Sequence, residues 1–325
     1  MRVGLDSFSL SPLKLEPLKL LDWVKTNGFA GIQFAKLGCD VGRLKEIRKH
    51  ADSLGLYTHA SVSSPNPYKT NPDNPDERIA LIIREIESAA ECGWHELHAC
   101  LGGPDDRYHS QTAWSDQIHG STEMLKKLAP VLTACSSRIN LETHGEATTF
   151  ELVRMVEEVG PETTGICLDT ANVLIFGEDP VRATERAAPY THMTHAKDAI
   201  LYFTDKGFQR QGKPPGEGLV DWDRVLEILI RHDPELPISI EDHKWLFDID
   251  VFTPEWHAQQ PDLSREEFAE VIRLARECEV RIQQGEIPKP DSYEAIPFLE
   301  QMDARLCGGR DYLTNIINRL HKGDK

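Results

Sequence analysis

The stretch that decides the fold of this chain is RINLETHG, at residues 138–145. It reads as a short buried strand that ends in a carboxylate and an imidazole. Three later stretches repeat the design, namely GICLD at 165–169, YTHMTH at 190–195 and PISIE at 237–241. Each is a few mostly apolar or β-branched residues followed by a side chain that can bind a metal ion. These four side chains are Glu142, Asp169, His195 and Glu241. A single strand often ends in a polar residue, but four in a row, separated by helical stretches, indicate one convergent site.

The alternation of strands and helices extends upstream of this stretch. Four more strands are predicted at 3–7, 29–34, 56–62 and 96–101. A helical pattern follows every strand, and the eighth helix is predicted at 264–278, behind a plausible capping box. Eight βα units in sequence imply a parallel sheet and fit an α/β fold, a closed (β/α)₈ TIM barrel. The alternative is an open, doubly wound sheet, but no glycine-rich phosphate fingerprint follows the first strand.

The chain divides by this reasoning into two parts. Residues 1–280 are expected to form the barrel, and 281–325 to form a C-terminal helical arm packed on the barrel or on a partner subunit. Loops are expected at 65–75 and 102–106, and a longer one at 199–219. The last carries several glycines and prolines, so it is a candidate lid over the barrel mouth, with a solvated surface loop as the alternative.

Composition excludes several classes of partner. The net charge of −17 argues against nucleic acids and anionic membranes, which favour basic surfaces. No apolar run approaches the roughly 20 residues that span a membrane, and the N-terminus lacks a signal-peptide pattern. Seven scattered cysteines without a CxxC pair fit a reducing compartment, so we expect a cytoplasmic protein.

The residues at the four strand ends indicate a metal site. In a (β/α)₈ barrel the C-terminal ends of the strands meet in one mouth. Three carboxylates and one imidazole form a mostly oxygen ligand set that suits Mn²⁺, Mg²⁺ or Co²⁺. Zn²⁺ is less favoured because no thiolate is available. One divalent ion, with Mn²⁺ as the expected metal, is therefore predicted.

Short motifs surround the four strand ends. They are LETHG at 141–145, LDTAN at 168–172, HAKD at 195–198, PGEG at 215–218 followed by Asp221 and Trp222, and Ile240-Glu241. By these motifs the sequence resembles a known family, the xylose-isomerase-like TIM barrels or sugar phosphate isomerase/epimerase superfamily. The resemblance covers about residues 1–280. A weaker match is GFAGIQ at 28–33, where the family often has Glu in place of Gln33.

The resemblance implies an activity and a mechanism. Glu142, Asp169, His195 and Glu241 would bind one divalent cation, which acidifies a C–H beside a carbonyl and stabilises an enediolate. In the family's epimerases two ligand glutamates move the proton from opposite faces, and Glu142 and Glu241 stand at those positions. The expected reaction is sugar isomerisation or epimerisation. The alternative is a lyase or dehydratase that expels a β-leaving group from a keto sugar or keto polyol, as C-glycoside deglycosidases do. An endonuclease, as in another branch of the family, is disfavoured by the net charge.

Further residues are candidates for substrate contact. His144 follows Glu142 by two positions and is a candidate base or hydrogen-bond donor, or a structural histidine. The substrate-binding candidates are His59, His98, Asn172, Lys197, Arg210 and Trp245. Each also has a plain structural interpretation, as a core, strand-end or loop residue. The expected substrate is a small carbohydrate or polyol, neutral or weakly anionic. The protein is expected to form a homo-oligomer, with a small second subunit as a further option.

Overall fold

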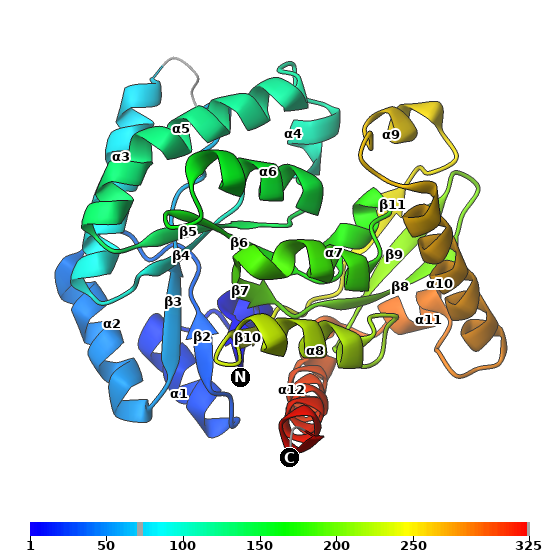
Figure 1. Cartoon of the computed structure of the whole chain (residues 1–325). Helices are drawn as coiled ribbons and strands as arrows, with labels where there is room; N and C mark the ends of the chain where they lie inside the picture. Colours follow the sequence, from blue (N-terminus) through cyan, green and yellow to red (C-terminus); the bar gives the residue numbers. More distant parts are fainter. Residues whose placement is uncertain (70–73, 324–325) are drawn as a thin grey trace.

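The computed structural model describes residues 1–69 and 74–323, and its centre is a closed barrel of parallel strands (Figure 1). The barrel strands are β1 Arg2–Asp6, β2 Gly31–Gln33, β3 Tyr57–Ser61, β4 Glu96–Ala99, β5 Arg138–Glu142, β6 Thr164–Asp169, β7 Thr191–His195 and β10 Pro237–Ile240. They are hydrogen-bonded in the order β10-β1-β2-β3-β4-β5-β6-β7. A parallel bridge between Ala196 and Ile240 joins the two ends. This confirms the predicted (β/α)₈ TIM barrel.

The register of the strands brings the predicted ligands to one level. On neighbouring strands, Glu142 pairs with Cys167, and Asp169 pairs with His195. Glu241 follows the last residue of β10. Because all the strands are parallel, these positions share one end of the barrel, which is where active sites of this fold lie.

Helices cover the outside of the barrel. They are α1 Pro17–Thr26, α2 Val41–Leu54, α3 Pro75–Glu91, α5 Trp114–Ala134, α6 Thr149–Val159, α7 Pro180–Ala187 and α8 Trp222–His232. Polar side chains start several of them, since the first amide groups of a helix have no partner within it. Thr148 and Glu151 form a reciprocal capping box at the start of α6. Asp40 accepts from the amide of Arg43 at the start of α2.

The eighth outer helix is not the one that the sequence predicted. The helix expected at 264–278 exists as α10 Arg265–Gln283, but it packs chiefly against β8 Asp198–Phe203, outside the barrel. The long C-terminal helix α12 Phe298–Gly323 contacts β1, β10 and α8 instead. Five of its apolar residues are buried in the main core, namely Met302, Leu306, Leu313, Ile316 and Ile317. The last helix thus closes the outer ring where the chain began (Figure 1).

The lid-like loop expected at 199–219 is largely a β-hairpin. β8 and β9 Phe208–Lys213 pair antiparallel, and β11 Leu246–Ile249 adds a third strand on β9. This small sheet lies beside the barrel with α10 and α9 Pro254–Ala258 (Figure 1). The prediction of an open loop was wrong over these strands, and within 199–219 only the turn at 204–207 and the segment after β9 are irregular.

Short elements complete the chain. Part of the loop expected at 102–106 is helical, as α4 Pro104–Tyr108, while residues 70–73 of the loop expected at 65–75 lie outside the described residues. The remaining elements are η1 Ser7–Leu13, η2 Asn172–Phe176, η3 Ala188–Tyr190 and α11 Pro290–Glu294. Among the helices of the described part, none is long and apolar enough to cross a membrane.

Candidate active site

Four predicted ligands meet at the C-terminal end of the barrel. Glu142, Asp169, His195 and Glu241 each offer one ligand atom, and these atoms all lie within 4.8 Å of one another. His195 is central, because its Nδ1 lies 2.9 Å from Oε2 of Glu241 and 3.2 Å from Oε1 of Glu142. All four side chains are buried. The structure therefore brings together a set of donors that the sequence placed on four separate strands.

The donor atoms of this quartet fit a divalent cation. Within residues 1–69 and 74–323, Nδ1 of His195 and Oε1 of Glu142 are buried without an aligned hydrogen bond. Buried polar atoms are rarely left without a partner, so two such atoms facing each other suggest a missing ligand. Three carboxylates with one imidazole suit a hard or borderline ion such as Mn²⁺ or Mg²⁺.

Opposite charges within the site stabilise the ionised form of each other and shift the pKa values of these groups. Burial alone would raise the pKa of Glu142 and Glu241, but cationic neighbours hold both well below the usual range. His195 is the main such neighbour of Glu142, and Lys197 of Glu241. Burial alone would lower the pKa of His195, yet the groups around it hold that pKa well above the usual value. A divalent cation would therefore compete with a proton for Nδ1 of His195.

Lys197 and Asn172 hold the ligand carboxylates from the side. Nζ of Lys197 lies 2.9 Å from Oδ2 of Asp169 and 3.1 Å from Oε2 of Glu241. The side-chain amide of Asn172 donates to Oδ2 of Asp169 at 2.8 Å. Arg210, on β9, donates in turn to Oδ1 of Asn172 at 3.0 Å. Thus Lys197 and Asn172 contact the predicted metal ligands directly, and Arg210 contacts Asn172.

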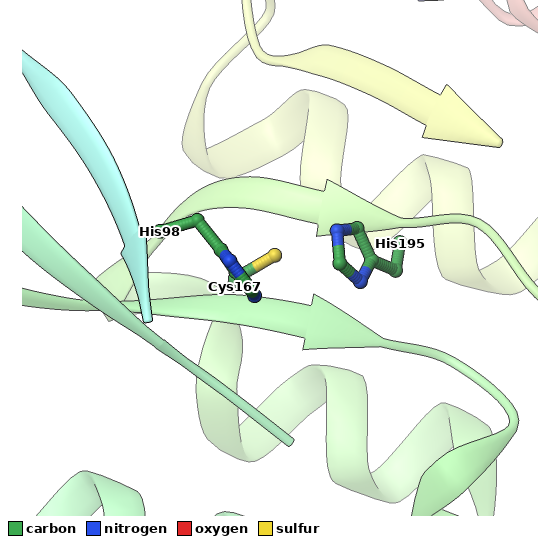
Figure 2. Close-up of side chains that lie close together, drawn as sticks. All are labelled: His98, Cys167 and His195. Atoms are coloured by element: carbon green, nitrogen blue, oxygen red, sulfur yellow. The ribbon is translucent and has the colours of Figure 1, made fainter. Parts of the chain in front are cut away.

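His98 approaches the site from β4. Its Nε2 lies 2.8 Å from Oε2 of Glu142, and its Nδ1 lies 3.0 Å from the hydroxyl of Ser61. Figure 2 shows His98 and His195 with Cys167, whose thiol points toward the His195 ring. Burial raises the pKa of Cys167 to about 12, so the group is a neutral thiol at neutral pH. Cys167 therefore lies next to His195 as an uncharged side chain.

His144 is held by a carboxylate that lies outside the quartet. Its Nδ1 lies 2.7 Å from Oε2 of Glu146, a fully buried residue that also accepts from the amide of Gly102. Burial alone would lower the pKa of His144, but Glu146 and then Glu142 outweigh burial and raise it to about 10. The free imidazole nitrogen is therefore suited to donate a proton.

A cavity of about 260 Å³ opens over these residues. Its lining includes the side chains of Glu142, His144, His195, Lys197 and Glu241 and, among the substrate candidates, His98, Asn172, Arg210 and Trp245. Trp245 is 53 % exposed, so it stands at the rim. His59 does not line this cavity, since its ring packs 5.4 Å from the ring of Tyr57. Burial lowers the pKa of His59 to about 4.

Comparison with known proteins decides the family. Residues 21–249, well over half of the chain, match the family described as "Xylose isomerase-like TIM barrel". The chain belongs to this family. The predicted resemblance is thereby confirmed.

One relative, a bacterial protein, shares part of its sequence with this chain. A segment of 122 residues is 25 % identical to the uncharacterized protein YihM of Escherichia coli K12. The match covers 38 % of this chain and 37 % of YihM, so it spans well under half of that relative.

Two solved structures share the fold of this chain at low sequence identity. The 3-keto-D-glucoside 4-epimerase YcjR of E. coli superimposes with a TM-score of 0.59 and 15 % identity, over 84 % of this chain and 99 % of YcjR. A D-psicose 3-epimerase of Clostridium cellulolyticum H10 gives 0.61 and 17 %, over 85 % of this chain and 98 % of that enzyme. At such identities the likeness shows the barrel fold.

Three residues of this xylose-isomerase-like site were not among the predicted site residues. Gln33 places its side-chain nitrogen 2.7 Å from Nε2 of His195. Asp6, at the end of β1, lies 3.7 Å from the same atom. Nε2 of His243 lies 3.3 Å from Oε1 of Glu241. Alternation would have indicated His243, which follows Glu241 by two positions, and Asp6 ends a strand as the ligands do.

Proposed function

We propose that this protein is a divalent-metal-dependent sugar epimerase or isomerase that moves a proton α to a carbonyl. The observation that carries the proposal is that Glu142 and Glu241, from different strands, both reach Nδ1 of His195 within 3.2 Å. Two carboxylates on one small site are what an epimerase needs, because one removes the proton and the other returns it. The names of the structural neighbours, a 3-keto-D-glucoside 4-epimerase and a D-psicose 3-epimerase, support the same class.

The quartet would hold the ion, with Mn²⁺ as the preferred metal. A divalent cation there supplies Lewis-acid chemistry, which lowers the pKa of a C–H beside a carbonyl. The protein supplies the proton carriers. His98 binds Oε2 of Glu142, and His243 lies beside Oε1 of Glu241, so each carboxylate is fixed by its own histidine. Fixed carboxylates keep the geometry that proton transfer requires.

The remaining residues of the cavity suit substrate binding. His144 presents a donor to the cavity because Glu146 holds its other nitrogen. Trp245 at the rim offers an aromatic face to the apolar side of a sugar ring. The lysine and the arginine of the lining, Lys197 and Arg210, already face Asp169 and Asn172, which favours a neutral substrate over a phosphorylated one.

A lyase is the second candidate function, and the His144–Glu146 pair favours it. A histidine whose pKa is raised to about 10 carries a proton at neutral pH. Such a group can protonate a leaving group after a glutamate has removed the α-proton. The reaction would then be β-elimination from a keto sugar, through the same initial step.

The two functions differ in the product. The test incubates Mn²⁺-loaded protein with D-psicose, D-fructose, L-ribulose and a 3-keto-glucoside in D₂O, followed by NMR. We expect deuterium to enter beside the carbonyl and a stereoisomer to accumulate, with the carbon skeleton and all substituents retained. Loss of a substituent would assign the lyase instead. Absence of exchange on all substrates, in protein that holds one metal ion per chain, would refute both.

A further inference from the structure

A second cavity adjoins the first. It has a volume of about 480 Å³, against about 260 Å³ for the cavity over the quartet. Pro104, Ile175 and Phe247 line both cavities and form the lip between them. The second cavity lies between α4, β11 and α9, which come from distant parts of the chain (Figure 1). Its volume falls in the range of roughly 300–1,000 Å³ that small-molecule pockets occupy. We call it the distal groove.

The lining of the distal groove combines apolar surface with carboxylates. The apolar and aromatic residues are Ile175, Leu246, Phe247, Ile249, Tyr108 and Trp256. The acidic residues are Asp105, Asp248, Asp250 and Glu255. Among the described residues that line it, none is lysine or arginine. Such a surface repels phosphates and carboxylates, whereas carboxylate oxygens accept hydrogen bonds from hydroxyl groups.

One buried donor in the lining has no partner. Trp256 is 5 % exposed, and its indole N–H makes no hydrogen bond within residues 1–69 and 74–323. Trp and Tyr side chains usually find a hydrogen-bond partner when they are buried. The ring itself is fixed by Phe268, 5.6 Å away between centroids, and by the N-terminal turn of α9, where Thr253 accepts from the Trp256 amide. Trp256 lines the groove, but its nitrogen is itself buried, so a ligand hydroxyl would accept from this N–H only after the ring rotates toward the groove.

We propose that the distal groove binds a neutral sugar unit that is linked to the reacting sugar. Pyranose rings present apolar C–H faces to aromatic side chains and hydroxyl groups to carboxylates, and the lining offers both. The natural substrate is then a glycoside with at least two units, whose reacting ring occupies the cavity over the quartet. This inference rests on the proposed function for the reacting ring, and it adds the class of substrate.

The experiment compares ligands that differ by one unit. Dissociation constants of the Mn²⁺-loaded protein are measured by calorimetry for methyl glucoside, for cellobiose, maltose and sucrose, and for 4-nitrophenyl glucoside. We expect at least one disaccharide to bind about tenfold or more tightly than methyl glucoside, as the extra contacts require. Trp256→Phe and Asp248→Asn should remove most of that gain and leave methyl glucoside binding unchanged. Glu87→Gln, an exposed carboxylate on α3, is the matched control.

The outcomes separate this inference from the proposed function. Two results would overturn the proposal that the distal groove binds a sugar unit. One is equal dissociation constants for all the sugars, and the other is groove variants that weaken the binding of methyl glucoside and of disaccharides to the same extent. A gain for the nitrophenyl glucoside without any gain for a disaccharide would also overturn it, in favour of an aromatic aglycone. Proton exchange on monosaccharides tests the proposed function without involving the distal groove. If that exchange is absent while disaccharide selectivity depends on Trp256, the groove stands and the reaction must be sought elsewhere.

Discussion

Gln33 contacts His195 on the side of the imidazole ring that faces away from Glu142 and Glu241. The side-chain nitrogen of Gln33 lies 2.7 Å from Nε2 of His195, while Nδ1 faces Glu142 and Glu241. A neutral histidine that binds a metal through Nδ1 carries its proton on Nε2. A half-turn of the Gln33 amide brings Oε1, which is buried without a partner in the described part, into position to accept that proton. Gln33 thereby selects the tautomer that can bind a cation.

The first prediction follows from this contact. Gln33→Leu removes the acceptor and should weaken Mn²⁺ binding by about 10- to 100-fold, the usual effect of losing the hydrogen-bond partner of a ligand histidine. Gln33→Glu keeps an acceptor at the same place and should retain most of the affinity. Competition with a fluorescent chelator measures both. Equal affinity in the Leu variant, with an unchanged circular dichroism spectrum, would remove Gln33 from any role in metal binding.

The second prediction concerns stability. A cation that binds the folded state alone stabilises it by about 2.7 kcal/mol at a concentration 100-fold above the dissociation constant. Saturating Mn²⁺ should therefore raise the melting temperature by several degrees, and EDTA should reverse the increase. Glu241→Gln should abolish the shift because it removes one of the four ligands. Glu87→Gln should shift as the unmodified protein does. A shift that survives in Glu241→Gln would place the ion at another site.

The quartet was predictable from sequence because barrel geometry is simple. Strand ends at Glu142, Asp169, His195 and Glu241 follow from short apolar runs, and parallel strands bring such ends together. The contacts around them join residues far apart in sequence, such as Gln33 and His195, and although Gln33 ends β2, no pattern within one strand predicts which ligand it contacts. The fold and the four ligands can thus be predicted from the periodicity of the sequence. The side chains that hold these ligands in place depend on packing across the barrel, which the sequence alone does not show.

Glycine misled the prediction for the segment that holds Arg210. Gly207 and Gly212 were interpreted as signs of a loop, but both lie where another segment of backbone approaches closely. A Cβ atom on Gly207 would lie 2.1 Å from the carbonyl oxygen of Ile249, and one on Gly212 would lie 2.7 Å from that of His243. At both positions glycine is needed because a side chain would collide with neighbouring backbone. A single sequence cannot distinguish such a glycine from one in a flexible loop. Arg210 consequently lies on the ordered strand β9.

The third prediction concerns a buried lysine in the small sheet. Nζ of Lys213 lies 3.0 Å from the centroid of the Tyr293 ring and has no hydrogen bond within the described residues. Burial, and then the charge of Arg305, lower the pKa of Lys213 to about 7. The unfolded chain therefore binds more protons than the folded one between about pH 7 and pH 10.5, so stability rises with pH across that window.

Replacing Lys213 tests whether the buried lysine lowers the stability of the folded protein at neutral pH. Lys213→Met keeps a chain of similar length without the charge, so it should stabilise the protein at pH 7 by an amount on the order of 2 kcal/mol. The difference should shrink toward pH 10. Urea unfolding across this pH range measures it, with the exposed Lys206→Met as the control. A variant that is less stable at pH 7 would mean that the Tyr293 ring stabilises the cation by more than burial costs.

The last prediction separates the roles of His144. Nδ1 of His144 is held by Glu146, so the opposite nitrogen is directed by that contact. If His144 donates to the substrate, His144→Ala should lower turnover by about 10²- to 10⁴-fold while proton exchange beside the carbonyl persists through Glu142 and Glu241. Glu146→Gln keeps a hydrogen-bonding group at the same place and should show a smaller loss, mainly in kcat. Metal content, measured in both variants, should equal that of the unmodified protein. Complete loss of exchange in His144→Ala with normal metal content would make His144 the base. Loss of the metal itself would show that His144 supports Glu142, and neither the donor nor the base role would then hold.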